Sequence, residues 1–173
     1  HEFVASDVRL TFVGVSRSCP VTLSGGQSVG GTFDSLQRSP DGNAARHRVA
    51  VGVRNSAGAA VGNCVEMTAL DSVPASCTGR TVNDATIPSG LAVPTAAGTY
   101  TLWAEDYLTV GSPCALFQDA SNAHTAEQLL KKKLCVVTVP PPCDHEFVAS
   151  DVRLTFGGVS RSCPVTLSGG QSV

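Results

Sequence analysis

Residues 1–12 read HEFVASDVRLTF, and the same twelve residues return at positions 145–156. The match continues to Val29 and Val173, and it has a single difference, Val13 against Gly157. A copying artefact would more often be exact, so the pattern favours a true duplication with a period of 144 residues, from position 1 to position 145. That period far exceeds the roughly 20 to 50 residues of solenoid repeats, and each unit is therefore expected to be a domain.

The duplicated segment alternates between apolar and polar residues, which is typical of a β-strand with one buried face. In the first copy the apolar residues of this expected face are Val4, Val8, Leu10 and Phe12. In the second copy they are Val148, Val152, Leu154 and Phe156.

The cysteines indicate an oxidising compartment. Of the seven, Cys163 is the second copy of Cys19, which leaves six in one period: Cys19, Cys64, Cys77, Cys114, Cys135 and Cys143. An even number without a C-x-x-C pair predicts three disulfides rather than a zinc site, and fifteen pairings are open. Cys143 lies beside a proline run and Cys19/Cys163 lies where the copies overlap, so these are the candidates for a cystine at the junction of two units.

Further strands are expected where the alternation returns, over residues 47–54, 65–69, 97–110 and 134–139. Gly25-Gly26 and Gly30-Gly31 are interpreted as turns, and the prolines between residues 71 and 94 allow only edge strands or loop there. One short helix is predicted from Asn122 to Lys133, because Thr125 and Gln128 have capping-box spacing and three lysines follow.

These elements predict an all-β fold, a sandwich of about seven or eight antiparallel strands with one short helix. Residues 1–139 are expected to form the repeat unit, 140–144 a proline-rich linker and 145–173 the start of the next unit. In an alternative frame, residues 1–29 are a connector or donor segment and 30–173 a complete domain.

The stretch Ala-Gly-Thr-Tyr-Thr-Leu at 97–102, with a valine-rich last strand and a proline linker, resembles the immunoglobulin-like repeats of surface adhesins and extracellular fibres. The resemblance implies an immunoglobulin-like β-sandwich. It covers about a tenth of the unit, and the Cys, Trp, Cys order of antibody-type domains is missing.

Composition and motifs argue against several kinds of function. A net charge of −2 with 15% charged residues gives no basic surface for nucleic acid, and no run of about 20 apolar residues could span a membrane. No catalytic, metal or cofactor motif occurs, so an enzyme is not expected.

His47 is interpreted as a surface or turn residue. Asp106 interrupts an apolar face and is expected to pair with an arginine or to mark a bulge, while the adjacent Glu105 should point to the opposite face.

The first functional hypothesis is a structural subunit of an extracellular or cell-surface filament, stalk or pilus-like fibre, in which copies contact one another in a tandem or helical array. A sharper form is that the duplicated strand is donated to a neighbouring domain, and pairing of residues 3–12 wholly inside their own domain would contradict that form. The alternative is a repetitive adhesin or carbohydrate-binding module, in which exposed Trp103 and Tyr107 stack on a glycan.

Overall fold

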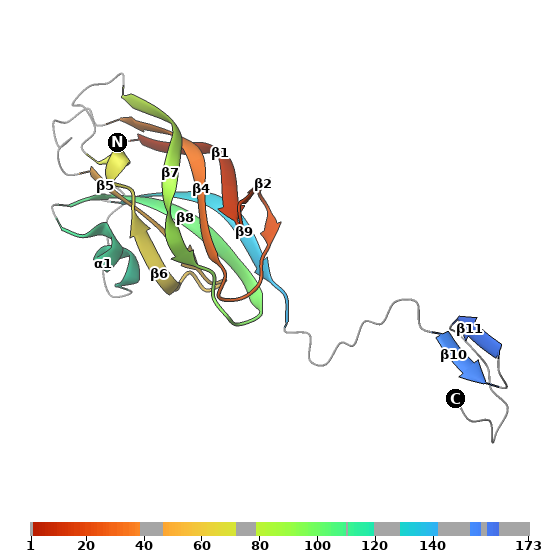
Figure 1. Ribbon diagram of the computed structural model, residues 1–173. Coiled ribbons are helices and arrows are strands. Elements are labelled where there is room, and N and C mark those ends of the chain that lie inside the picture. The colour runs from red at the N-terminus through yellow and green to blue at the C-terminus, as the bar shows by residue number, and fades with distance from the viewer. Residues whose placement is uncertain are drawn as a thin grey trace. The chain divides into compact units, whose positions relative to one another are not determined.

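The computed structural model describes residues 2–38, 47–71, 79–109, 111–119 and 129–141, and the strand backbones 153–156 and 159–162. The chain divides into two compact units, His1–Pro141 and Pro142–Val173, and the division lies within the proline run. Figure 1 shows the strands of both units.

The first unit is an all-β sandwich of two sheets with one short α-helix (Figure 1). The β4 sheet has the order β2-β1-β4-β7, with β1 at Glu2–Phe12, β2 at Val15–Ser18, β4 at Ser28–Arg38 and β7 at Arg80–Ala92. The β8 sheet has the order β3-β9-β8-β5-β6, with β3 at Val21–Thr22, β9 at Leu129–Val139, β8 at Gly98–Leu108, β5 at His47–Arg54 and β6 at Ala60–Glu66. The described part of this unit thus has nine strands, and β3 and β9 pair parallel while the other neighbours pair antiparallel.

The core lies between the two sheets and contains the inward side chains that the alternation predicts. In β5, Val49, Val51 and Val53 are buried, and β8 contributes Leu102 and Ala104 to the same core. These side chains pack with those of the β4 sheet, among them Leu10, Val29, Phe33, Ile87 and Leu91. Burial of these faces, at about 25 cal/mol per Å² of apolar surface, is the main force that holds the sheets together.

The predicted turn at Gly30-Gly31 is wrong, because both glycines lie within β4. A Cβ atom on Gly31 would collide with the carbonyl oxygen of Arg9, so glycine allows β1 to approach β4 closely here. β7, by contrast, occupies the edge of its sheet and contains Pro88, as the prolines of this region predict.

A bulge in β1 changes which of its residues face the core. Its register against β4 shifts between Ser6 and Arg9, and Asp7 has a φ of 45°. Phe3 before the bulge and Leu10 after it are 1% and 0% exposed. Val8 and Phe12 pack against the same core as predicted, but Val4, which follows buried Phe3, does not. The assignment of Val4 to the buried face is therefore wrong.

The first copy of the duplicated segment belongs to its own unit. β1 pairs with β2 from Arg9 to Phe12 and with β4 from Glu2 to Thr11. Residues 3–12 are thus paired inside their own sandwich, and the hypothesis that the first copy is donated to a neighbouring domain is wrong.

The second copy repeats part of this arrangement. β10 at Arg153–Phe156 pairs with β11 at Val159–Ser162 in the same register as β1 with β2, shifted by the repeat period. Leu154 and Phe156 lie in β10, whereas Val148 and Val152 lie outside the described residues.

The short helix lies elsewhere than predicted. α1 runs from Pro113 to Gln118, and the hydroxyl of Ser112 accepts the backbone N–H of Ala115 as its N-cap. Residues 129–133 form the beginning of β9, so the helix prediction is wrong there, and residues 122–128 lie outside the described residues. The described helices include none long and apolar enough to span a bilayer.

Candidate functional site

A disulfide joins the segment between β2 and β3 to the last strand of the first unit. Cys19 lies between β2 and β3, and it is bonded to Cys135 in β9, 116 residues further along the chain. Beside this bond, Val21 pairs parallel with Val137, and the N–H of Leu23 donates to the carbonyl of Thr138 at 3.0 Å. We call this arrangement the terminal tie.

The β9 side of the terminal tie is buried, and the disulfide closes a long loop. Cys135 and Val137 are 2% and 3% exposed. By the loop-entropy argument, closing a loop of 116 residues stabilises the folded state by about 5 kcal/mol. The candidate role of Cys19 in a cystine between units is wrong, because Cys19 is bonded within its own unit. Cys77, Cys143 and Cys163 lie outside the described residues.

The second disulfide joins Cys64 in β6 to Cys114 in α1. It fixes the helix against the outer face of the β8 sheet, where Phe117 packs with Ala50 and Tyr107. The ring of Phe117 lies directly over Gly52, and a Cβ atom there would come within 2.5 Å of the ring. Glycine at position 52 is therefore required for this close contact.

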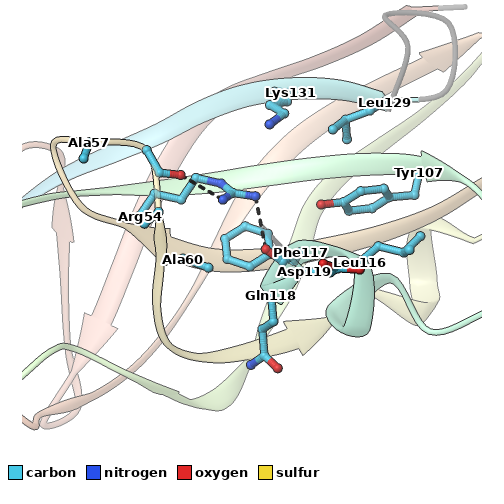
Figure 2. Close-up of a pocket in the computed structure, with 12 residues that line it drawn as sticks. Arg54, Ala57, Ala60, Tyr107, Leu116, Phe117, Gln118, Asp119, Leu129 and Lys131 are labelled. Carbon is cyan, nitrogen blue, oxygen red and sulfur yellow. Dashed lines mark hydrogen bonds between the residues drawn. The ribbon is translucent and has the colours of Figure 1, made fainter. Parts of the chain in front are cut away.

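A pocket of about 360 Å³ lies beside α1 on the same face (Figure 2). Arg54 extends across it from the end of β5, and Lys131 approaches from β9. The Arg54 guanidinium lies 4.2 Å from the centre of the Phe117 ring and donates to the carbonyls of Gly58 and Phe117 at 2.9 and 3.2 Å.

Arg54 and Tyr107, which line this pocket, both contact the fully buried carboxylate of Glu105. Arg54 donates to both of its oxygens, through Nε at 2.7 Å and Nη2 at 2.9 Å, and the hydroxyl of Tyr107 donates at 2.5 Å. Burial and then the bond to Glu105 raise the pKa of Tyr107 above its usual value of 10.0. Burial by itself lowers the pKa of Arg54, but the hydrogen bonds and charge of Glu105 outweigh it and raise that pKa.

These contacts give the carboxylate a structural rather than a chemical role. Two charge-assisted bonds and one hydroxyl bond already occupy both oxygens of Glu105, and the Lys131 ammonium lies 3.8 Å from Oε1. The arrangement holds β5, β8, β9 and α1 together. Neither Arg54 nor Glu105 belongs to a recognisable motif, since 51 residues separate them in the sequence.

The structure does not expose both of the aromatic residues that were expected to stack on a glycan. Tyr107 is 1% exposed and directs its hydroxyl to Glu105, so its assignment as an exposed residue is wrong. Trp103 is half-buried and packs against the same apolar group under α1.

On the inner face, Asp106 lies in a buried polar chain that crosses the sandwich. Its Oδ2 is 2.9 Å from Nδ1 of His47 and accepts Nε2 of Gln37 at 3.1 Å, and Arg80 donates to Gln37 at 3.3 Å. Among the described residues, the partners of Asp106 are therefore a histidine and a glutamine rather than an arginine. His47 is 2% exposed, so its interpretation as a surface residue is wrong, while Glu105 and Asp106 point to opposite faces as predicted.

The turn between β1 and β2 carries the one position that differs between the copies. Phe12 pairs with Val15, so the turn consists of Val13 and Gly14, whose φ values are 47° and 73°. Positive φ at both central residues is the type I′ hairpin turn, which β-branched residues adopt only with strain. Val13 is also 85% exposed, and Gly157 in the second copy is the residue that this backbone favours.

Comparison with known proteins finds no family and no curated protein that matches this chain.

Proposed function

We propose that this chain is part of a tandem array of disulfide-tied sandwiches that serves as a structural, non-catalytic element of an extracellular fibre or stalk. The observation that carries the proposal is the terminal tie. The unit's first segment and its last strand are the ones to which tandem neighbours attach, and Cys19 bonds to Cys135 between them.

The tie gives such an array a defined mechanical property. Tension on the chain enters a unit through the segment before Cys19 and leaves through the segment after Cys135. The covalent bond carries the tension between these two points, so the chain between them, which spans a sequence separation of 116, is not extended. A unit that resists extension in this way suits a fibre that carries tension.

Other features agree with this function. Pro140–Pro142 favours an extended polyproline II spacer between units. The second copy forms a hairpin of the same register, which supports a repeated unit.

Electron microscopy of the native material, together with the mass of the intact chain, tests the proposal. We expect fibres, and a chain mass of several 144-residue periods. A native chain with the mass of a single repeat and no fibres would contradict it. We do not propose the adhesin alternative, because the burial of Tyr107 removes half of the aromatic surface on which it rested.

A further inference from the structure

The pocket beside α1 contains more positive charge than its buried carboxylate neutralises. Arg54 forms a bidentate ion pair with Glu105, at 2.7 and 2.9 Å. Lys131 brings a second cation, whose ammonium lies 3.8 Å from Oε1 of the same carboxylate. Asp119 also lines the pocket, but it is exposed at the end of α1, where water screens its charge. Two cations therefore face one buried anion, and one positive charge is left over.

The same two cations have N–H donors to spare among the described residues. An arginine has five N–H donors, and four of those of Arg54 bond to Glu105, Gly58 and Phe117. The Lys131 ammonium has three, and its 3.8 Å distance to Glu105 exceeds the length of a hydrogen bond. One guanidinium N–H and the ammonium can thus bond to an acceptor that enters the pocket.

The walls of the pocket are apolar and preformed. Figure 2 shows Leu129 beside Lys131 on one side and Phe117 on the other. The helix that carries Phe117 is fixed to β6 by the Cys64–Cys114 disulfide, so the wall needs no ordering when a ligand binds. The volume of about 360 Å³ falls within the range of sites that take small organic molecules.

We propose that this pocket binds a small organic monocarboxylate, whose carboxylate group lies on the Lys131 ammonium and the remaining N–H of Arg54. The apolar part of the ligand packs against Leu129 and Phe117. A single negative charge balances the single positive charge left over, so a monoanion fits better than a neutral molecule or a dianion. This binding goes beyond the proposed function in a fibre, because the pocket lies within one unit and needs no assembly.

Binding of benzoate to the full 173-residue chain, followed by NMR spectroscopy of the isotope-labelled protein, tests the proposal. Benzoate joins one carboxylate to one apolar ring, and benzamide has nearly the same shape without the charge. We expect a Kd of about 1 mM or lower for benzoate, and one weaker by about tenfold or more for benzamide. The signals that shift should be those of the pocket, such as Arg54, Phe117 and Lys131. Equal affinity for the two probes, shifts confined to other residues, or no saturable binding of benzoate would overturn the proposal.

Lys131→Gln and Lys132→Gln form a matched pair of variants. The two lysines are adjacent and exposed in β9, and their side chains lie on opposite faces of the strand. Both variants remove one positive charge, and neither disturbs the core. Lys131→Gln should weaken benzoate binding by about tenfold or more, whereas Lys132→Gln should leave it nearly unchanged. Equal losses in the two variants would show a general effect of net charge and would contradict a site at Lys131.

Ala60→Leu separates a pocket from simple ion pairing at the surface. Ala60 lines the pocket opposite Arg54 in the ladder between β5 and β6, so a larger side chain fills the apolar space without a change of charge. Benzoate should then bind at least about tenfold more weakly, with Lys131 still present. Undiminished binding to Ala60→Leu would contradict the pocket. The urea midpoint of each variant, measured without ligand, shows that the comparison is made between folded chains.

Discussion

Removal of the terminal tie should change how far one unit lengthens under force. In the intact unit the Cα atoms of Cys19 and Cys135 are 5.3 Å apart, and the disulfide keeps them there although the two residues are 116 positions apart in the sequence. Only residues 1–18 and 136–141 of the unit can then extend, by roughly 80 Å in all at about 3.5 Å per residue. The sandwich between them should not unfold by extension.

The Cys64–Cys114 bond lies within the loop that Cys19–Cys135 closes, so removal of the bonds should lengthen the unit in two steps. With Cys19→Ser and Cys135→Ser, the 116 residues become available except for the 50 that Cys64–Cys114 still closes, which leaves 66. The additional lengthening should be about 230 Å. Full reduction should bring it to about 400 Å. Replacement of Cys64 and Cys114 by serine is the matched control, and it should add nothing while the terminal tie is intact.

Single-molecule force spectroscopy on the full chain, held at its two ends, measures these lengths. Cys77, Cys143 and Cys163 are replaced by serine in every version, so that no other cystine forms and the second unit contributes equally throughout. Reducing a unit that has already folded in the oxidised form covers the case in which Cys19→Ser does not fold. The reasoning is refuted if the oxidised unit itself releases about 400 Å, or if removal of the terminal tie leaves the extension unchanged.

Three further predictions concern stability, each measured by urea denaturation. Val13→Gly, which installs the residue of Gly157, should raise the free energy of unfolding by about 1 kcal/mol, because it removes a β-branched residue from positive φ; a loss of stability would show that the turn is not strained. Arg54→Ala should lower it by about 3–5 kcal/mol, since Glu105 then stays buried without its two N–H donors, and Glu105→Gln in the same chain should recover part of the loss. Tyr107 has a folded-state pKa above its unfolded value of 10.0, so its contribution to stability is present below pH 10.0 and is lost as the pH rises beyond it. Tyr107→Phe should therefore make the decline of stability at alkaline pH shallower, and an unchanged slope would contradict this assignment.

Sequence periodicity predicted the strands whose one face is wholly buried, and it was insufficient where the backbone is irregular. In β5 the alternation of Val49, Val51 and Val53 reflects burial directly. In β1 the alternation continues past Asp7, where a bulge shifts the face by one residue and places Phe3 rather than Val4 inside. Aspartate tolerates positive φ without requiring it, so the sequence carried no sign of the shift.

The helix prediction was wrong because a tertiary contact outweighed a local signal. Lys131–Lys133 have the pattern of a helix end, but Lys131 lies opposite Glu105 in the ladder between β8 and β9. Glu105 itself is neutralised by Arg54, 51 residues earlier in the chain. No spacing rule connects these residues, since they meet only after the β8 sheet has formed. Short sequence motifs therefore could not predict the ion pair between Arg54 and Glu105.

The cysteines show most clearly what the sequence could and could not determine. Their even number per period predicted disulfides, but the pairing depends on which strands become neighbours. Cys19 meets Cys135 because β3 joins the edge of the β8 sheet beside β9. β3 is only two residues long, so no sequence pattern predicts its parallel pairing with β9. The pairing also changes the expected role of the cysteine: a bond between units would have set how one unit follows the next, whereas the bond within a unit sets how far that unit can be stretched.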